Sequence, residues 1–156
     1  MSDGPTTGLQ PTGLQSMLCF DLYAASRALT AAYRPVLAPH GLTYPQYLVL
    51  VALWNDDDVL IKDLATTLHL DHATLTPLLR RLEDRGLLSR VRSRDDGRAV
   101  RVALTAVGDE LRSIVDDVHC AITDAVGLDA DERAAVQDAL QRLVVSLSGQ
   151  PAGQGA

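Results

Sequence analysis

Two cysteines are the residues with the widest chemical scope in this chain of 156 residues. Cys19 lies in the apolar stretch LCFDLYAASR. A single cysteine in an apolar helix is most often a small core residue. A reactive cysteine instead needs hydrogen-bond donors or positive charge to stabilise its thiolate. Tyrosine hydroxyls can be such donors, and all four tyrosines follow Cys19 within the first third of the chain: Tyr23, Tyr33, Tyr44 and Tyr47. The residues alone leave both interpretations open.

Cys120 lies in HCAITDAV, in the middle of a predicted helix, where an unpaired thiol is the default expectation. Its neighbour His119 indicates a metal site only weakly. Two cysteines cannot form a disulfide framework. Together with the histidines they also lack the spacing of zinc ligands. We therefore expect no metal and no cofactor from these residues: Cys19, Cys120, His40, His69, His72 and His119.

Positive charge is concentrated in one short window. Residues 80–101 hold eight of the 14 basic residues: Arg80, Arg81, Arg85, Arg90, Arg92, Arg94, Arg98 and Arg101. Four acidic residues share this window, so its net charge is +4, whereas the whole chain carries −6 and the remainder −10. A local cationic surface on an acidic body is suited to phosphate contact through that surface alone. We therefore expect a double-stranded DNA partner.

The window follows a helix pattern that changes into a hairpin pattern. Asp71 is placed as an N-cap, leucines recur at helical spacing, and Gly86 is a C-terminal stop. From Leu88 the period changes to two, and Asp96-Gly97 is a strong hairpin signal. A helix followed by a basic hairpin predicts a winged helix-turn-helix over residues 43–104. The predicted exposed face of the recognition helix comprises His72, Ala73, Thr74, Thr76, Pro77, Arg80 and Arg81.

The hairpin tip supplies the second predicted DNA contact. Arg98 follows the tip glycine, and narrow minor grooves attract arginine. Asp96 is placed to brace it. On an arbitrary helix, the competing explanation for Arg80, Arg81 and Arg85 would be a solvated face shared with acidic neighbours. The further arginines of the hairpin favour DNA binding instead.

The rest of the chain predicts a mainly α fold around this small β-wing. We expect a flexible arm at 1–13, a sensor and dimerisation helix at 14–42, C-terminal dimerisation helices at 105–148 and a flexible tail at 149–156. Thr43 with Gln46, and Asp129 with Glu132, are capping boxes. Val59-Leu60 can add a third strand before the helix Ile61–Leu68, which lacks a good cap. A single helix is expected from Thr105 to Val126.

The flanking helices carry more apolar residues than one winged unit can cover. An uncovered apolar stripe implies a partner surface, and a two-fold homodimer would supply one. Two recognition helices would then lie about 34 Å apart, one DNA turn, on a pseudo-palindromic operator. The N-terminal residues lack the pattern of a signal peptide, and no apolar run has membrane-spanning length. We therefore expect a reducing cytoplasmic location and no membrane partner.

Several stretches resemble a known family over about residues 14–147. LCFDLYAASR, AAYRP, GLTYPQYLVLVALW, LDHATLTPLLRRLEDRGLLSR and the wing DDGRAVRVALT are similar to the MarR family, and specifically to its organic-hydroperoxide-sensing OhrR branch. The resemblance implies that Cys19 is the peroxide-reactive sensor. It also implies that Tyr33 and Tyr44 of the other subunit hydrogen-bond to its sulfur. Cys120 would be a resolving cysteine, or a low-molecular-weight thiol would take that role.

The resulting hypothesis is a repressor that releases DNA when an organic hydroperoxide oxidises Cys19, rather than an enzyme. One alternative is a MarR-type regulator that responds to a reversibly bound phenolic or lipophilic ligand. Another, from a different class, is a thiol peroxidase, for which two cysteines would suffice in principle. The arginine-rich wing would then have no explanation.

Overall fold

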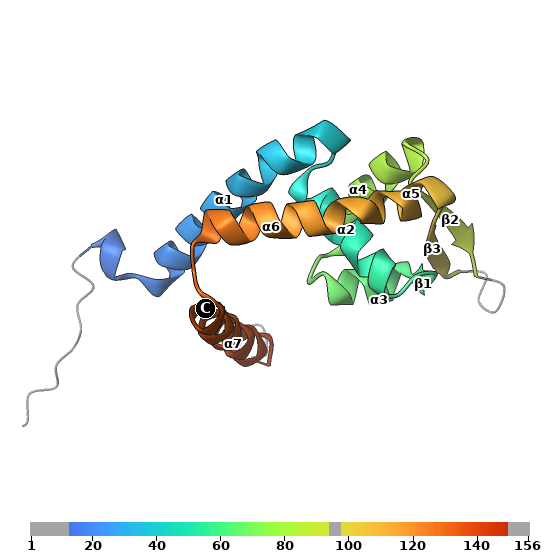
Figure 1. Cartoon of the computed structure of the whole chain (residues 1–156). Helices are drawn as coiled ribbons and strands as arrows, with labels where there is room; N and C mark the ends of the chain where they lie inside the picture. The colour runs from blue at the N-terminus through green and yellow to red at the C-terminus, as the bar shows by residue number, and fades with distance from the viewer. Residues whose placement is uncertain (1–12, 94–97, 150–156) are drawn as a thin grey trace, which may run out of the picture.

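The chain folds into helices arranged around one small sheet (Figure 1). The computed structural model describes residues 13–93 and 98–149. In chain order the elements are η1 (Leu14–Ser16), α1 (Leu18–Leu37), η2 (Ala38–His40), α2 (Tyr44–Asn55), β1 (Val59–Leu60), α3 (Ile61–Thr67), α4 (His72–Asp84), β2 (Leu88–Arg92), β3 (Val100–Leu104), α5 (Ala106–Glu110), η3 (Leu111–Ile114), α6 (Val115–Val126) and α7 (Ala130–Ser148). This order confirms the predicted mainly α fold with a small β-wing.

The first helix begins later than its apolar pattern predicts. Met17 has an extended backbone, so residues from Leu14 form a separate 3-10 turn and α1 begins at Leu18. The predicted end of the helix near His40-Gly41 is confirmed, because Gly41 takes the left-handed conformation at φ 63°. The capping box of α2 is also confirmed. The backbone N–H of Thr43 donates to Oε1 of Gln46 at 3.0 Å.

The sheet has the strand order β1-β3-β2, with both pairings antiparallel. Val59 pairs with Val102, which confirms the predicted third strand. Gly86 adopts a left-handed φ of 69° and ends α4, as expected. The hairpin turn predicted at Asp96-Gly97 lies outside the described residues.

The core is shared by the helices on both sides of the winged unit and by the sheet. Its fully buried side chains come from α1, α2, α4, β2, β3 and α6: Leu37, Val49, Leu50, Leu53, Leu75, Leu79, Leu82, Leu88, Val102 and Val118. Removing each such leucine from water is worth about 1.5–3 kcal/mol. Three of these leucines line one side of α4, so the opposite side of that helix faces outward.

The predicted single helix from Thr105 to Val126 is divided into α5, η3 and α6. The Thr105 cap is confirmed, because its hydroxyl accepts from the Gly108 N–H at 3.1 Å. Leu111 and Ile114 stand three residues apart and both pack on the core. That spacing suits a 3-10 turn as well as an α-helix, so the apolar pattern could not distinguish them.

The last helix has no buried residue within the described chain. Its capping box is confirmed, with Asp129 Oδ1 accepting from the N–H groups of Asp131 and Glu132. In Figure 1, α7 lies apart from the winged unit, near the end of α6. It exposes several large apolar side chains: Val136, Leu140, Val144, Val145 and Leu147.

No single helix in the described ranges is long and apolar enough to cross a membrane. Leu18–His40 and Tyr44–Asn55 meet that criterion only as a pair bent by 75°.

Candidate functional site

The recognition helix α4 presents every residue predicted for its outer face. His72, Ala73, Thr74, Thr76, Pro77, Arg80 and Arg81 are all exposed. The helix is anchored from behind by Leu75, Leu79 and Leu82. Asp71 begins it as predicted, and its Oδ1 accepts from the Thr74 N–H at 2.7 Å. Hydrogen bonds from Thr74 lower the pKa of Asp71, so this cap stays ionised at neutral pH.

The arginine-rich window divides into structural and outward-facing residues. Arg90 donates to Oε2 of Glu83 from Nε at 2.8 Å, which joins β2 to α4. Arg85 donates to two backbone carbonyls, that of Gly41 at 2.6 Å and that of His40 at 2.8 Å. The expectation that Arg85 shares the DNA-facing surface is therefore corrected, because its guanidinium is committed to the turn after α1. Arg80, Arg81 and Arg92 remain exposed.

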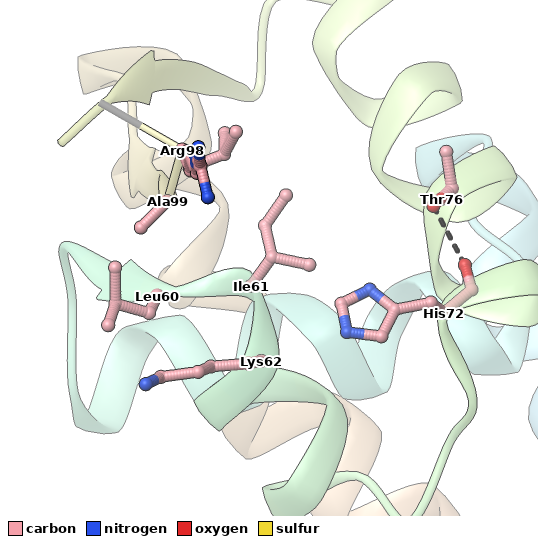
Figure 2. Close-up of a pocket in the computed structure, with 8 residues that line it drawn as sticks. Leu60, Ile61, Lys62, His72, Thr76, Arg98 and Ala99 are labelled. Atoms are coloured by element: carbon pink, nitrogen blue, oxygen red, sulfur yellow. Dashed lines mark hydrogen bonds between the residues drawn. The ribbon is translucent and has the colours of Figure 1, made fainter. Parts of the chain in front are cut away.

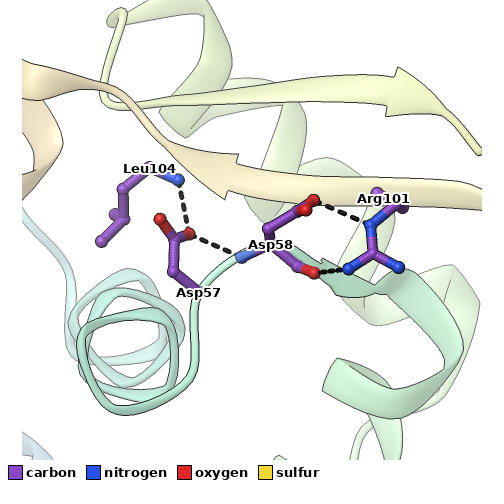
Figure 3. Close-up of polar contacts among 4 residues, drawn as sticks. All are labelled: Asp57, Asp58, Arg101 and Leu104. Atoms are coloured by element: carbon purple, nitrogen blue, oxygen red, sulfur yellow. Dashed lines mark hydrogen bonds and ion pairs between the residues drawn. The ribbon is translucent and has the colours of Figure 1, made fainter.

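The wing is fastened to the turn before β1 by two aspartates (Figure 3). Asp57 Oδ1 accepts from the Leu104 N–H at 2.8 Å. Asp58 Oδ1 accepts from Nε of Arg101 at 2.8 Å, and its backbone carbonyl accepts from Nη2 of the same residue. In sequence, this acidic run indicated only the end of a helix. Its partners lie 43 and 47 residues away, so no local signal could have revealed the contact.

Arg98 is exposed at the base of the wing tip, as a groove-reading residue must be. Asp96, its predicted brace, lies outside the described residues. Between Arg98 and the start of α4 is an open notch of about 300 Å³ (Figure 2). Its rim includes Lys62, a basic residue that the sequence patterns did not single out.

Three tyrosines gather at the C-terminal half of α1. The ring centroids of Tyr33 and Tyr44 lie 4.3 Å apart, and those of Tyr33 and Tyr47 lie 6.0 Å apart. Burial raises the pKa of all three hydroxyls. They therefore remain protonated at neutral pH and can donate hydrogen bonds. Tyr23 is outside this group, since its hydroxyl accepts from Arg27 at 3.1 Å.

Cys19 lies at the opposite end of α1 from this tyrosine cluster. It is 14 residues from Tyr33 on one continuous helix, which corresponds to about 21 Å along the axis. Within one chain, therefore, the thiol and the Tyr33 hydroxyl are not brought together. Cys19 is a free, exposed thiol, and so is Cys120 on α6.

The middle of α1, from Leu22 to Ala32, contributes to an apolar groove. This open groove of about 530 Å³ lies between α1, the end of α6 and α7. Leu22 and Leu29 line it from α1, and Val136 and Leu140 line it from α7. This uncovered surface is the apolar stripe expected from the sequence.

Comparison with known proteins identifies the family. Residues 31–118 match the family described as transcriptional regulator SarA/Rot. The chain is 38% identical over 134 residues to the organic hydroperoxide resistance transcriptional regulator of Bacillus subtilis, covering 86% of this chain and 91% of that protein. It is 45% identical over 130 residues to the HTH-type transcriptional regulator TtmR of Methylorubrum extorquens, covering 83% and 67%. The chain belongs to the MarR family of winged-helix transcriptional regulators.

The fold of this MarR-family regulator is similar to that of a regulator solved in complex with DNA. Reduced AbfR bound to DNA has a TM-score of 0.71 and 34% identity, covering 86% of this chain and 94% of that one. The expected winged helix-turn-helix, the regulatory class and DNA as a partner are thereby confirmed. The individual DNA contacts and the roles of Cys19, Tyr33, Tyr44 and Cys120 stay predictions.

Proposed function

We propose that this MarR-family regulator is a homodimeric repressor that releases its operator when an organic hydroperoxide oxidises Cys19. The proposal is carried by the observation that the two predicted parts of the sensor, the thiol and the tyrosine hydroxyls, lie at opposite ends of α1. An exposed thiol stands at one end, and protonated phenols stand about 21 Å away at the other. The 38% identity to the Bacillus subtilis organic hydroperoxide resistance regulator supports the same function.

A second copy of the chain completes this site. The exposed apolar residues of α1 and α7 need a cover, and a two-fold partner can supply the same surface. Two α1 helices running in opposite directions would bring Cys19 of one copy to the tyrosine cluster of the other. Hydroxyls of Tyr33 and Tyr44 would then donate to the sulfur and stabilise its thiolate.

Oxidation proceeds in two steps, formation of a sulfenic acid and then of a disulfide. The Cys19 thiolate attacks one peroxide oxygen, the O–O bond breaks, and the alkoxide leaves and takes up a proton to become the alcohol. The sulfur is oxidised by two electrons to a sulfenic acid while the peroxide is reduced. A second thiol, either Cys120 of the partner or a small thiol, then attacks the sulfenic sulfur. A disulfide forms and water leaves.

Either product changes the contacts between the sensor end of one α1 and the tyrosines of the other. The two recognition helices must keep a separation of about 34 Å to occupy both half-sites. A change in this interface alters that separation, and the dimer then loses one half-site. In this proposal Arg80, Arg81 and Arg98 supply the DNA contacts that are lost.

The test uses DNA selected from a random duplex pool by the reduced protein. Binding is measured before and after one equivalent of cumene hydroperoxide for three proteins: wild type, Cys19→Ser and Cys120→Ser. We expect release by the wild type and persistent binding by Cys19→Ser. Cys120→Ser removes the other exposed thiol, and it shows whether release requires the candidate resolving cysteine. Wild-type binding that persists after oxidation would refute the sensing mechanism.

Non-reducing electrophoresis of the same samples identifies the second thiol. A covalent dimer that requires both cysteines assigns the resolving role to Cys120. Release that occurs without a covalent dimer, and only when free cysteine is added together with the peroxide, assigns that role to a small thiol.

The apolar groove favours a second candidate, release by a reversibly bound lipophilic ligand. A variant without cysteines separates the two functions. If it still releases DNA with such a ligand, the groove is the sensor. The thiol peroxidase alternative predicts many turnovers with excess reductant, whereas a sensor consumes about one peroxide per Cys19.

A further inference from the structure

The lining of the notch beside the recognition helix includes basic residues from three separate elements. Lys62 comes from α3, His72 from the first turn of α4, and Arg98 from the base of the wing tip. Figure 2 shows Ile61 between the His72 imidazole and the Arg98 guanidinium. The notch is open, with a volume of about 300 Å³. No acidic side chain is among its lining residues in the described chain.

The position of the notch determines what must cross it. When a recognition helix enters the major groove and a wing enters the adjacent minor groove, one sugar-phosphate strand runs between them. The notch lies between α4 and the wing, so that strand passes over it. We propose that the notch binds one backbone phosphate of the operator, with Lys62 and His72 as contacts alongside Arg98. This inference rests on DNA binding by the winged unit.

Each side chain has a distinct part in holding the phosphate. Lys62 is exposed and carries an ammonium with three donors on a flexible stem, which suits a point charge at the rim. His72 presents an imidazole donor from the start of α4. The Thr76 hydroxyl is already committed, since it donates to the His72 carbonyl at 2.7 Å. This bond helps to hold the first turn of α4 in place.

The α4 N-terminus does not by itself supply this site. The Asp71 carboxylate occupies the Thr74 N–H and places a negative charge at that end of the helix. The Asp71 carboxylate thus already compensates the positive end of the α4 dipole. Attraction for a phosphate must therefore come from the basic side chains. Of these, Lys62 is the residue whose contribution can be measured separately.

Lys62 is the only lysine in the sequence. An amine-selective acetylating reagent should therefore modify Lys62 and the amino terminus alone. We expect a saturating selected duplex to slow acetylation of Lys62 at least tenfold while the amino terminus serves as the internal reference. Mass spectrometry of the digested protein gives both rates. Equal Lys62 rates with and without DNA would overturn the proposal.

The salt dependence of affinity tests the same contact independently. Each phosphate contact contributes about 0.9 to the slope of log K against log salt. A dimer has two notches, so Lys62→Met should reduce the slope by about 1.8. Methionine is chosen because it removes the charge and keeps a long unbranched side chain. Arg142→Met is the control, because Arg142 pairs with Asp138 on α7, outside the notch. An unchanged slope for Lys62→Met would contradict the phosphate contact.

A duplex with single neutral methylphosphonates locates the phosphate. Wild-type affinity should fall wherever a contacted phosphate is neutralised, and Lys62→Met should show no further loss at one symmetric pair of these positions only. If wild type binds no duplex, both this inference and the proposed function fail. If DNA binds but peroxide does not release it, only the sensing proposal fails and the notch stands. If release is normal but Lys62 is unprotected, only the notch proposal fails.

Discussion

Gly108 fixes the point at which the C-terminal helices leave the winged unit. A Cβ at this position would lie 1.8 Å from the Leu87 carbonyl oxygen and 3.2 Å from Cδ2 of Leu104. The Leu87 oxygen also accepts from the Thr105 N–H at 3.1 Å, so it cannot retreat without weakening that bond. The Gly108 carbonyl in turn accepts from Nε1 of Trp54 at 3.0 Å. Gly108→Ala must therefore displace either α5 or the backbone of Leu87, which directly precedes β2.

The magnitude follows from two opposing effects. Alanine in place of glycine favours a helix by up to about 1 kcal/mol. Overpacking against a fixed backbone typically costs about 1–3 kcal/mol, and a 1.8 Å contact with backbone lies at the severe end. We expect a net loss of roughly 1–2 kcal/mol, which for a chain of this size lowers Tm by roughly 2–8 °C.

Thermal unfolding followed by circular dichroism at one fixed protein concentration measures this loss, because dimer stability depends on concentration. Gly149→Ala is the matched control. Its Cβ would meet only the Val145 oxygen at 3.4 Å, an ordinary contact, so Tm should hold or rise slightly. A Tm for Gly108→Ala equal to or above wild type would refute the steric reasoning.

Two further predictions concern the ion pairs. The hydrogen bonds from Arg90 lower the pKa of Glu83, so their stabilisation is present above the unfolded pKa of about 4.3 and is lost as pH falls through the folded pKa. Glu83→Gln should thus lower Tm more at pH 7 than at pH 3; an equal deficit at both values would contradict this coupling. Asp58→Ala removes a largely exposed pair with Arg101, so stability should change by less than about 1 kcal/mol. DNA affinity should nevertheless fall as the wing loosens, and unchanged binding by a fluorescence anisotropy titration would show that the pair does not position the wing.

The elements with strong end signals were predictable from sequence. Thr43, Asp71 and Asp129 each cap the helix expected of them, because a cap needs partners only two or three residues away. Gly86 likewise takes its left-handed turn for local steric reasons. The outward face of α4 followed from the spacing of its leucines. These features depend on residues only a few positions apart, so a local sequence pattern is enough to predict them.

The contacts that orient these elements were not predictable. Trp54 reaches Gly108 across 54 residues, and Arg85 reaches His40 across 45. Composition marked Arg85 only as one more member of a basic cluster. Lys62 was missed because a single lysine on a short helix has no periodic signal. Its place beside Arg98 arises only when α3 and the wing pack together.

The Arg85 contact links the two halves of the proposed mechanism. Its guanidinium joins the C-terminal end of α4 to the backbone of His40 and Gly41, directly after α1. The tyrosine cluster connects the same end of α1 to α2. A displacement of α1 caused by oxidation of the partner's sensor would therefore act on the recognition helix through hydrogen bonds already in place. The winged unit holds its predicted DNA-facing residues within one chain, whereas the proposed sensor needs both chains. In the proposed mechanism, control of DNA binding by oxidation is therefore a property of the dimer, with Arg85 at the junction.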